Sequence, residues 1–238
     1  MKHIVIFPTW ACQLECVYCS IRHSQIDRSI GSVPWSDWAV ALLEVLPRGS
    51  IVDIAGGEPF MYPGLVDLLH TLGNAGLNWA ITTNAKAGRP IVQLCKERPR
   101  GGLCINVSDH AGNPEAHERI RLMREAGWRV NVHRVDHPDA GHHEPDAEVI
   151  TYQDWIGGKA VDGMLRHCTA GINHWVAGPN GDLWRCVVAL ETGQPAVGNL
   201  FTREVRPTKM ECDFGCSACY TEDPGSWLIE MKVLEAVH

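Results

Sequence analysis

Residues 12–19 read Cys12-Gln-Leu-Glu-Cys16-Val-Tyr-Cys19, with three cysteines on one short stretch. They follow an apolar run, Ile4-Val-Ile-Phe7, which predicts a buried strand over 3–7. Three thiolates on one loop can hold three irons of a four-iron cluster. No fourth cysteine follows at this spacing, so the fourth iron would stay open to bind a ligand. The alternative is a set of three buried or zinc-bound cysteines.

Strand-like and helix-like segments alternate after this loop. We expect strands over 3–7, 51–54, 78–83, 103–108, 129–135 and 149–152, and helices over 36–46, 63–75, 89–96 and 114–126. Ser36 or Asp37 is expected to cap the first helix, Pro63 suits the first turn of the second, and residues 20–34 read as loop. This alternation predicts βαβ units and a parallel sheet. The carboxyl ends of its strands share one edge, where ligands collect.

Three polar motifs fall at predicted strand ends, on the same edge as the cysteine loop. They are Gly56-Gly-Glu-Pro59, Thr82-Thr-Asn84 and Ser108-Asp109. Glycines let a backbone approach a ligand closely, and the carboxylate of Glu58 can accept a hydrogen bond from an ammonium group. The alternative for each motif is an ordinary βα turn.

Ten cysteines are present, and most of them are grouped. The second group surrounds a predicted hairpin over 174–187 that turns at Pro179-Asn-Gly181. Its members are Cys168, Cys186, Cys212, Cys216 and Cys219. Since no export signal is visible and the cytosol keeps thiols reduced, this grouping favours metal over disulfides. Cys95 and Cys104 lie in apolar settings and are expected to be packing residues.

Composition narrows the class of protein. The chain has 238 residues and a net charge of −7, with no long basic run to favour nucleic acid as a partner. No stretch approaches the roughly 20 apolar residues of a membrane span, so we expect a cytoplasmic protein. The nine tryptophans are expected to pack in the core and between domains. A His142-His-Glu144 loop reads as solvated rather than metal-binding.

The cysteine spacing, with Tyr18 before the third cysteine, resembles the radical S-adenosylmethionine (radical SAM) superfamily. The resemblance implies an α/β fold, a partial (β/α)6 barrel over 1–160 that is open on one side. It also implies a 4Fe-4S cluster on Cys12, Cys16 and Cys19, whose open iron chelates the amino and carboxylate groups of SAM. Gly56-Gly-Glu-Pro59 matches the second motif of the family, which recognises the SAM amino group.

The resemblance assigns further cofactor-binding residues one by one. The implied SAM-binding set is Tyr18, Gly56, Gly57, Glu58, Pro59, Thr83, Asn84, Ser108, Asp109 and Arg134. Ala85 replaces the glycine of the family's third-strand motif, and His110 and Ala111 depart from its Ser-x-Asp-Gly pattern. Arg134 is a guess for the SAM carboxylate, and a surface arginine is an equal alternative. No catalytic acid or base is assigned.

The later cysteines resemble the SPASM and twitch domains, which hold auxiliary 4Fe-4S clusters. Cys168, Gly181 and Cys186 match the opening of that pattern. Too few cysteines follow for two clusters, so a twitch-type β-hairpin and helix domain with one cluster is expected over 161–225, before a helix over 226–238. The expected ligands are Cys168, Cys186, Cys216 and Cys219, with Cys212 as a spare or a replacement. The alternative is structural zinc.

The resemblance implies a reaction. A flavodoxin or ferredoxin would reduce the first cluster, SAM would be cleaved to methionine and a 5′-deoxyadenosyl radical, and that radical would take hydrogen from a substrate. The auxiliary cluster would accept an electron, which gives a net oxidation, as in the dehydrogenases of aminocyclitols. The first alternative is a maturase that makes a thioether, a carbon–carbon link or an epimer in a peptide, although no peptide-binding domain precedes Cys12. The second is a metal-binding protein without catalysis.

Overall fold

The computed structural model describes residues 2–24, 26–110, 113–136, 148–151, 170 and 174–205. Four of the predicted metal ligands lie outside these residues, namely Cys168, Cys212, Cys216 and Cys219. The predicted helix over 226–238, the His142-His-Glu144 loop and the predicted domain boundary near residue 160 also lie outside them.

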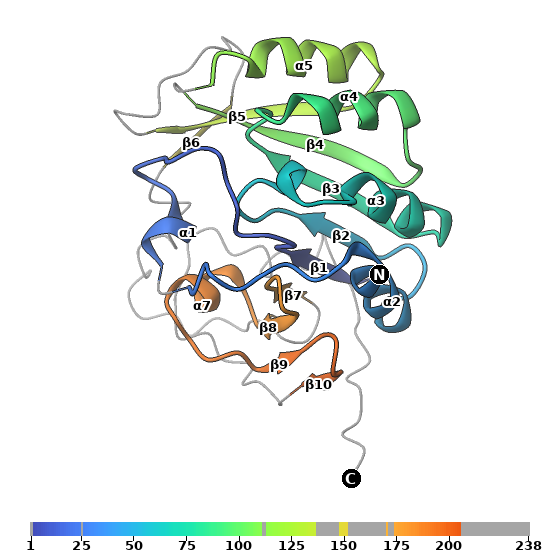
Figure 1. Cartoon of the computed structure of the whole chain (residues 1–238), viewed down its shortest axis with the longest axis vertical. Helices are drawn as coiled ribbons and strands as arrows, with labels where there is room; N and C mark the ends of the chain where they lie inside the picture. Colours follow the sequence, from blue (N-terminus) through green and yellow to red (C-terminus); the bar gives the residue numbers. More distant parts are fainter. Residues whose placement is uncertain are drawn as a thin grey trace.

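The described strands form a single sheet in the order β10-β9-β8-β7-β1-β2-β3-β4-β5-β6 (Figure 1). Their bounds are β1 His3–Ile6, β2 Ile51–Ile54, β3 Asn78–Thr83, β4 Gly102–Asp109, β5 Val130–Asp136, β6 Glu148–Thr151, β7 His174–Ala177, β8 Asp182–Trp184, β9 Gly198–Asn199 and β10 Glu204–Val205. Strands β1 to β6 are neighbours in chain order and pair in parallel. The predicted parallel sheet of βαβ units is confirmed.

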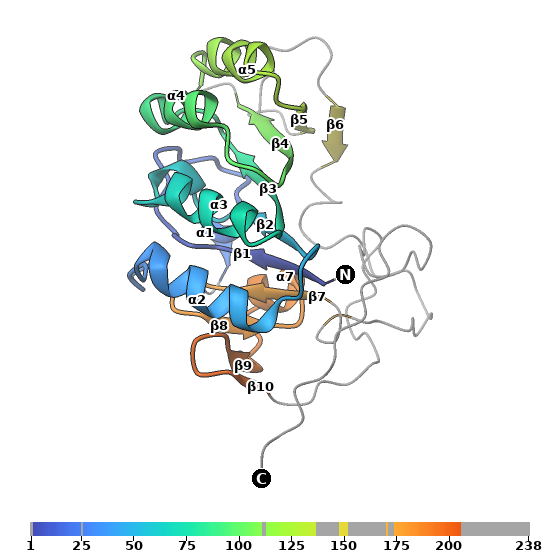
Figure 2. The ribbon, with the colours of Figure 1, turned by 90° about the vertical axis from the view of Figure 1, so that its right-hand side faces the viewer.

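The described helices lie on both sides of the sheet, and four of them cover one face (Figure 2). The described ones are α1 Ser20–His23, α2 Trp35–Val45, the 3₁₀ helix η1 Pro59–Met61, α3 Leu65–Asn74, α4 Gly88–Glu97, α5 Ala116–Glu125 and α7 Val187–Glu191. Figure 2 shows α2, α3, α4 and α5 on the same side of β1 to β5. None of the helices in the described part of the chain is long and apolar enough to cross a membrane.

The core lies between these helices and the sheet. On each strand every second side chain faces the helices, and Ile6, Ile54, Ile81 and Val107 are fully buried there. They pack with helix residues that include Trp38, Leu42, Leu68, Leu69 and Leu72. Trp38 and Trp79 are completely buried, which confirms the expected core role for these two tryptophans. The intervening side chains of the strands face the opposite side of the sheet.

Two helix starts differ from the sequence prediction. Helix α2 begins at Trp35 after an extended Pro34, so Ser36 and Asp37 lie in the first turn and neither caps the helix. Helix α3 begins at Leu65 and not at Pro63, because Gly64 has a φ of 77° and interrupts the helical backbone. The predicted loop over 20–34 also contains the single helical turn α1, which is too short to show a hydrophobic period.

The predicted hairpin is present and extends the parallel sheet. β7 and β8 pair in antiparallel fashion, and the backbone N–H of Gly181 donates to the carbonyl of Gly178 at 2.8 Å in the turn. β7 also pairs in parallel with β1, with His3 opposite His174. The hairpin therefore continues the sheet on the side of β1 that faces away from β2.

Candidate active site

The three-cysteine loop connects β1 to α1 at the carboxyl edge of the sheet. Cys12 is exposed, Cys16 and Cys19 are half-buried, and all three are free thiols. The backbone turns tightly here, because the N–H of Cys19 donates to the carbonyl of Cys16 at 3.2 Å. The backbone N–H of Leu14 points at the Cys12 sulfur, 3.4 Å away. The loop thus offers three thiols outside any disulfide and a backbone donor to one of them.

Burial disfavours the thiolate form of two of these cysteines. Burial raises the pKa of Cys12, and the charges of Glu58, Cys16 and Cys19 raise it further. Burial and the charge of Cys19 also raise the pKa of Cys16. Such thiols stay protonated near neutral pH unless a cation stabilises the thiolates, and bound iron supplies that charge.

The residues fit an iron–sulfur cluster. In a cubane cluster each thiolate binds a different iron, so the sulfurs need not converge on one point. Among the described residues, no group of three His, Cys, Asp or Glu side chains converges on a single metal ion. The thiols of Cys12, Cys16 and Cys19 have the donor chemistry that a four-iron cluster requires, and their role as its ligands stays a prediction.

The Gly56-Gly57 turn contacts the backbone that leads into the cysteine loop. The N–H of Gly57 donates to the carbonyl of Thr9 at 3.0 Å, and the N–H of Glu58 donates to that of Ala11 at 2.8 Å. A Cβ atom on Gly57 would lie 2.3 Å from the carbonyl oxygen of Ala11, and Gly56 has a φ of 128°. The glycines are thus required for a close approach between two loops of the protein itself.

Glu58 lies at the centre of a buried hydrogen-bond network. Its side chain is 0% exposed and accepts from the Thr83 hydroxyl at 2.7 Å, the Asn84 N–H at 2.7 Å and the Phe60 N–H at 3.1 Å. Burial raises its pKa to about 7, although these hydrogen bonds favour the ionised form. The carboxylate therefore fixes the turn after β3. Its predicted contact with the SAM amino group stays a prediction.

Asn84 connects this network to the cluster loop. Its Nδ2 donates to the Cys12 sulfur at 3.6 Å, and its Oδ1 accepts from the Gln13 Nε2 at 3.3 Å and from the Lys86 N–H at 2.9 Å. The side chain of Asn113 donates to the Asn84 carbonyl. Ala85, at the family's glycine position, has a φ of 57°. The turn thus keeps a left-handed backbone without glycine, and it places Asn84 beside a predicted cluster ligand.

Tyr18 and His110 form a second link to the cysteines. Tyr18 is buried, and its hydroxyl lies 2.5 Å from the His110 Nδ1. The two rings stack with centroids 5.7 Å apart. The Cys16 sulfur is 3.8 Å from the same nitrogen, and burial lowers the pKa of His110. The sequence showed His110 only as a departure from the family pattern, since nothing local signals a contact with Tyr18.

The remaining predicted SAM residues lie at the ends of β4 and β5. Asp109 is buried, and Ser108 is partly buried. Ser108 pairs with His133 and Asp109 with Arg134 in the parallel register. The side chain of Arg134 lies outside the described part of the chain. The structure therefore brings the backbone of all four predicted motifs to one edge of the sheet.

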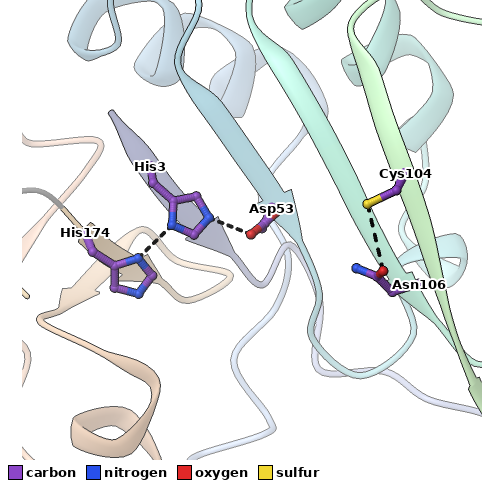
Figure 3. Close-up of polar contacts among 5 residues, drawn as sticks. All are labelled: His3, Asp53, Cys104, Asn106 and His174. Atoms are coloured by element: carbon purple, nitrogen blue, oxygen red, sulfur yellow. Dashed lines mark hydrogen bonds and ion pairs between the residues drawn. The ribbon is translucent and has the colours of Figure 1, made fainter. Parts of the chain in front are cut away.

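A row of polar side chains, which the sequence did not reveal, lies on the sheet face opposite the helices (Figure 3). His3 Nε2 is 2.5 Å from the Asp53 Oδ2, and His3 Nδ1 is 2.9 Å from the His174 Nδ1. Farther along the sheet, the Cys104 thiol donates to the Asn106 Oδ1 at 3.8 Å. The prediction that Cys104 is an apolar packing residue was wrong, because its strand turns it toward this polar face. Cys95, in contrast, packs against the core.

Cys186 is the one predicted auxiliary ligand within the described residues. Its sulfur accepts from the Ala189 N–H at 3.4 Å, at the start of α7. Helix α7 contacts α1, the turn that follows the three-cysteine loop. Ile21 and Leu190 share a small hydrophobic core with Phe7 and Trp10, and Cys19 packs against it. This core holds the cysteine loop against the hairpin region.

Comparison with known proteins assigns the fold. No protein-family model and no curated protein matches the sequence. Solved structures do match, and they show that the chain has the fold of the radical SAM superfamily. Streptococcus suis SuiB bound to precursor peptide SuiA gives a TM-score of 0.59 at 16% identity, over 85% of this chain and 63% of SuiB. Native anSMEcpe with bound AdoMet and Kp18Cys peptide gives a TM-score of 0.58 at 12% identity, over 96% of this chain and 92% of anSMEcpe.

SuiB has also been solved bound to S-adenosylmethionine. That structure gives a TM-score of 0.58 at 17% identity and covers 85% of this chain. This chain spans less than two thirds of the length of SuiB in both of these matches. The radical SAM fold predicted from the cysteine spacing is therefore confirmed.

Proposed function

We propose that this protein is a radical SAM enzyme, which cleaves SAM reductively and uses the resulting radical to take hydrogen from a substrate. One observation carries the proposal. Three free cysteines lie on a loop whose backbone is bonded to the Gly56-Gly57 turn. This loop sits at the carboxyl edge of a parallel sheet with the radical SAM fold. Ligands of parallel α/β folds bind at that edge.

Each predicted residue then has a task. Cys12, Cys16 and Cys19 hold a 4Fe-4S cluster. When bound, this cluster supplies the electron that breaks a carbon–sulfur bond of SAM, leaving methionine and a 5′-deoxyadenosyl radical. The chain positions SAM and excludes water around it. The residues assigned to SAM are Tyr18, Gly56, Gly57, Glu58, Pro59, Thr83, Asn84, Ser108, Asp109 and Arg134.

The glycine turn is the best supported part of this SAM site. The N–H groups of Gly57 and Glu58 donate to the carbonyls of Thr9 and Ala11, so this turn is fixed directly against the cysteine loop. Glu58 contributes by holding Thr83 and Asn84, which it does through both carboxylate oxygens. Tyr18 offers a buried aromatic ring on the same loop as the cysteines.

The polar row on the opposite sheet face is proposed to receive the polar groups of the substrate. Asp53 lies three residues before Gly56, which is about 10 Å along an extended strand. Its side chain is 39% exposed and His3 holds one of its oxygens. A substrate that enters from the strand ends would therefore meet hydrogen-bonding groups below the SAM site.

Net oxidation is the proposed outcome of the reaction. An auxiliary 4Fe-4S cluster would accept an electron from the substrate. Its proposed ligands are Cys168, Cys186, Cys216 and Cys219, with Cys212 as a spare or a replacement for one of them. The support is the position of Cys186, at the start of a helix that contacts α1 beside the first cluster loop. A flavodoxin or ferredoxin in the cytoplasm is the proposed electron donor.

Modification of a peptide is the second candidate. The observation in its favour is that three of the matching solved structures contain peptides, SuiA in SuiB and Kp18Cys or Cp18Cys in anSMEcpe. A peptide substrate would also meet the polar row, through one of its side chains. A supplied peptide that is altered in mass, or that takes up deuterium from D2O on epimerisation, with 5′-deoxyadenosine formed in proportion, would favour this candidate over oxidation of a small molecule.

The test is anaerobic reconstitution with iron and sulfide, followed by reduction with dithionite in the presence of SAM. We expect two clusters per chain and formation of 5′-deoxyadenosine. The Cys12→Ala/Cys16→Ala/Cys19→Ala variant should retain one cluster and form no 5′-deoxyadenosine, while the control Cys95→Ala retains both. Undiminished 5′-deoxyadenosine from the triple variant would refute the proposal. Metal bound without any SAM cleavage would support the non-catalytic alternative.

A further inference from the structure

Two residues from other strand ends reach the sulfurs of the predicted cluster ligands. The first is Asn84, after β3, whose Nδ2 lies 3.6 Å from the Cys12 sulfur. Its orientation is fixed by its neighbours. Because the Asn84 Oδ1 accepts from the Lys86 N–H and from Gln13, the amide nitrogen must be the atom that faces Cys12. Asn84 therefore donates to this sulfur, alongside the backbone N–H of Leu14 at 3.4 Å.

The second residue is His110, after β4. Its Nδ1 lies 2.5 Å from the Tyr18 hydroxyl and 3.8 Å from the Cys16 sulfur, and Tyr18 also bonds to Cys16. A thiolate that binds iron can only accept hydrogen bonds. In the arrangement that serves the sulfur, the Tyr18 O–H donates to Cys16, and the proton between the His110 Nδ1 and the Tyr18 oxygen belongs to His110. The result is a chain of donors that ends on the Cys16 sulfur.

These donors are held by rigid parts of the fold. The backbone N–H of Asn84 donates to the fully buried Glu58, and the Asn84 carbonyl accepts from Asn113. Tyr18 is 3% exposed, and its ring stacks on that of His110. Hydrogen bonds to the sulfurs of an iron–sulfur cluster raise its reduction potential, because the reduced cluster carries more negative charge.

We propose that Asn84 and His110 are positioning residues that raise the reduction potential of the cluster on Cys12, Cys16 and Cys19. The inference rests on the proposed function, since it needs the cluster to be present. It goes beyond that function because it assigns a role to His110, which departs from the family pattern, and because it gives Asn84 a partner other than SAM.

The experiment is a redox titration of the reconstituted full-length protein without SAM, followed by electron paramagnetic resonance. The variants are Asn84→Ala and His110→Phe. The matched controls are Asn131→Ala, an asparagine whose amide bonds to Asn106 and not to sulfur, and His70→Phe on the surface. Asn84→Ala removes a direct donor to Cys12 and should reduce the ratio of reduced to oxidised cluster at a fixed potential roughly tenfold, a shift of about 59 mV to more negative values. His110→Phe leaves Tyr18 as the donor to Cys16 but removes the support of its hydroxyl, and should shift the potential in the same direction by a smaller amount.

A rescue variant separates hydrogen bonding from packing. His110→Gln keeps an N–H donor and should bring the potential back toward that of the wild type, whereas His110→Phe should not. The two residues act on different sulfurs, so each can be tested without the other. If Asn84→Ala loses iron, the potential of His110→Phe tests the inference, and if His110→Phe loses iron, that of Asn84→Ala does. A variant of either residue that carries a full cluster at the wild-type potential overturns the inference. A wild-type protein that assembles no cluster on Cys12, Cys16 and Cys19 overturns the proposed function instead.

Discussion

Substitution of Gly57 by alanine should separate the two loops that build the active-site edge. The added Cβ would lie 2.3 Å from the Ala11 carbonyl oxygen and 2.5 Å from that of Trp10. Both are backbone atoms, which cannot rotate away, so the loops must move apart by about 1 Å to reach ordinary contact. That movement stretches the bonds from Gly57 to Thr9 and from Glu58 to Ala11, now 3.0 and 2.8 Å, beyond hydrogen-bonding distance.

The expected cost combines two effects. Overpacking of this kind costs about 1–3 kcal/mol, and two lost backbone hydrogen bonds cost about 1 kcal/mol each. We therefore expect Gly57→Ala to lower the free energy of unfolding by about 3–5 kcal/mol. The cysteine loop, released from its partner, should also hold less iron after reconstitution.

The assay is urea denaturation followed by circular dichroism, together with iron and sulfide analysis. Gly31→Ala is the matched control, because a Cβ atom at Gly31 meets no atom within 4 Å and its backbone is not left-handed. A Gly57→Ala protein with the stability and iron content of the Gly31→Ala control would refute the reasoning. It would mean that the loops are not held in contact by these glycines.

Two further predictions follow from buried side chains. The pKa of Glu58 is raised from 4.5 to about 7, so the folded state binds more protons than the unfolded state between these values. Stability should therefore fall by about 3 kcal/mol as the pH rises from 4.5 through 7, and Glu58→Gln should remove this part of the pH dependence in urea titrations at pH 5 and pH 8. Leu68→Ala, in the core under α3, should cost about 2–5 kcal/mol in the same assay. Val40→Ala on the exposed face of α2 should stay within about 0.5 kcal/mol of the wild type, and equal losses from both would contradict the packing described.

Local patterns in the sequence predicted the elements that carry the site. The strands over 51–54 and 78–83 have the predicted bounds, because short apolar runs between turn residues leave little choice of register. The cysteine loop and the glycine turn were found through spacing. Two helix starts were predicted wrongly, because the backbone conformations of Gly64 and Pro34, and not a capping side chain, determine where these helices begin.

Contacts between residues far apart in the chain could not be predicted from the sequence. His110 meets Tyr18 across 92 positions, and His174 meets His3 across 171. These pairs exist only because β4 ends beside the cysteine loop and β7 pairs with β1. Nothing near His110 or His174 distinguishes these histidines from surface ones. The same holds for Cys104, whose direction is set by the alternation of its strand.

The chain of His174, His3 and Asp53 has room for a single hydrogen between its two imidazole rings, since both Nδ1 atoms meet at 2.9 Å. Burial and the neighbouring His3 lower the pKa of His174 to about 3, so that ring stays neutral near neutral pH. When His3 carries one hydrogen it gives it to Asp53, and His174 must donate from Nδ1. The hydrogen bond between His3 and Asp53 on β2 therefore fixes the tautomer of an imidazole on β7, two strands away, without movement of the backbone.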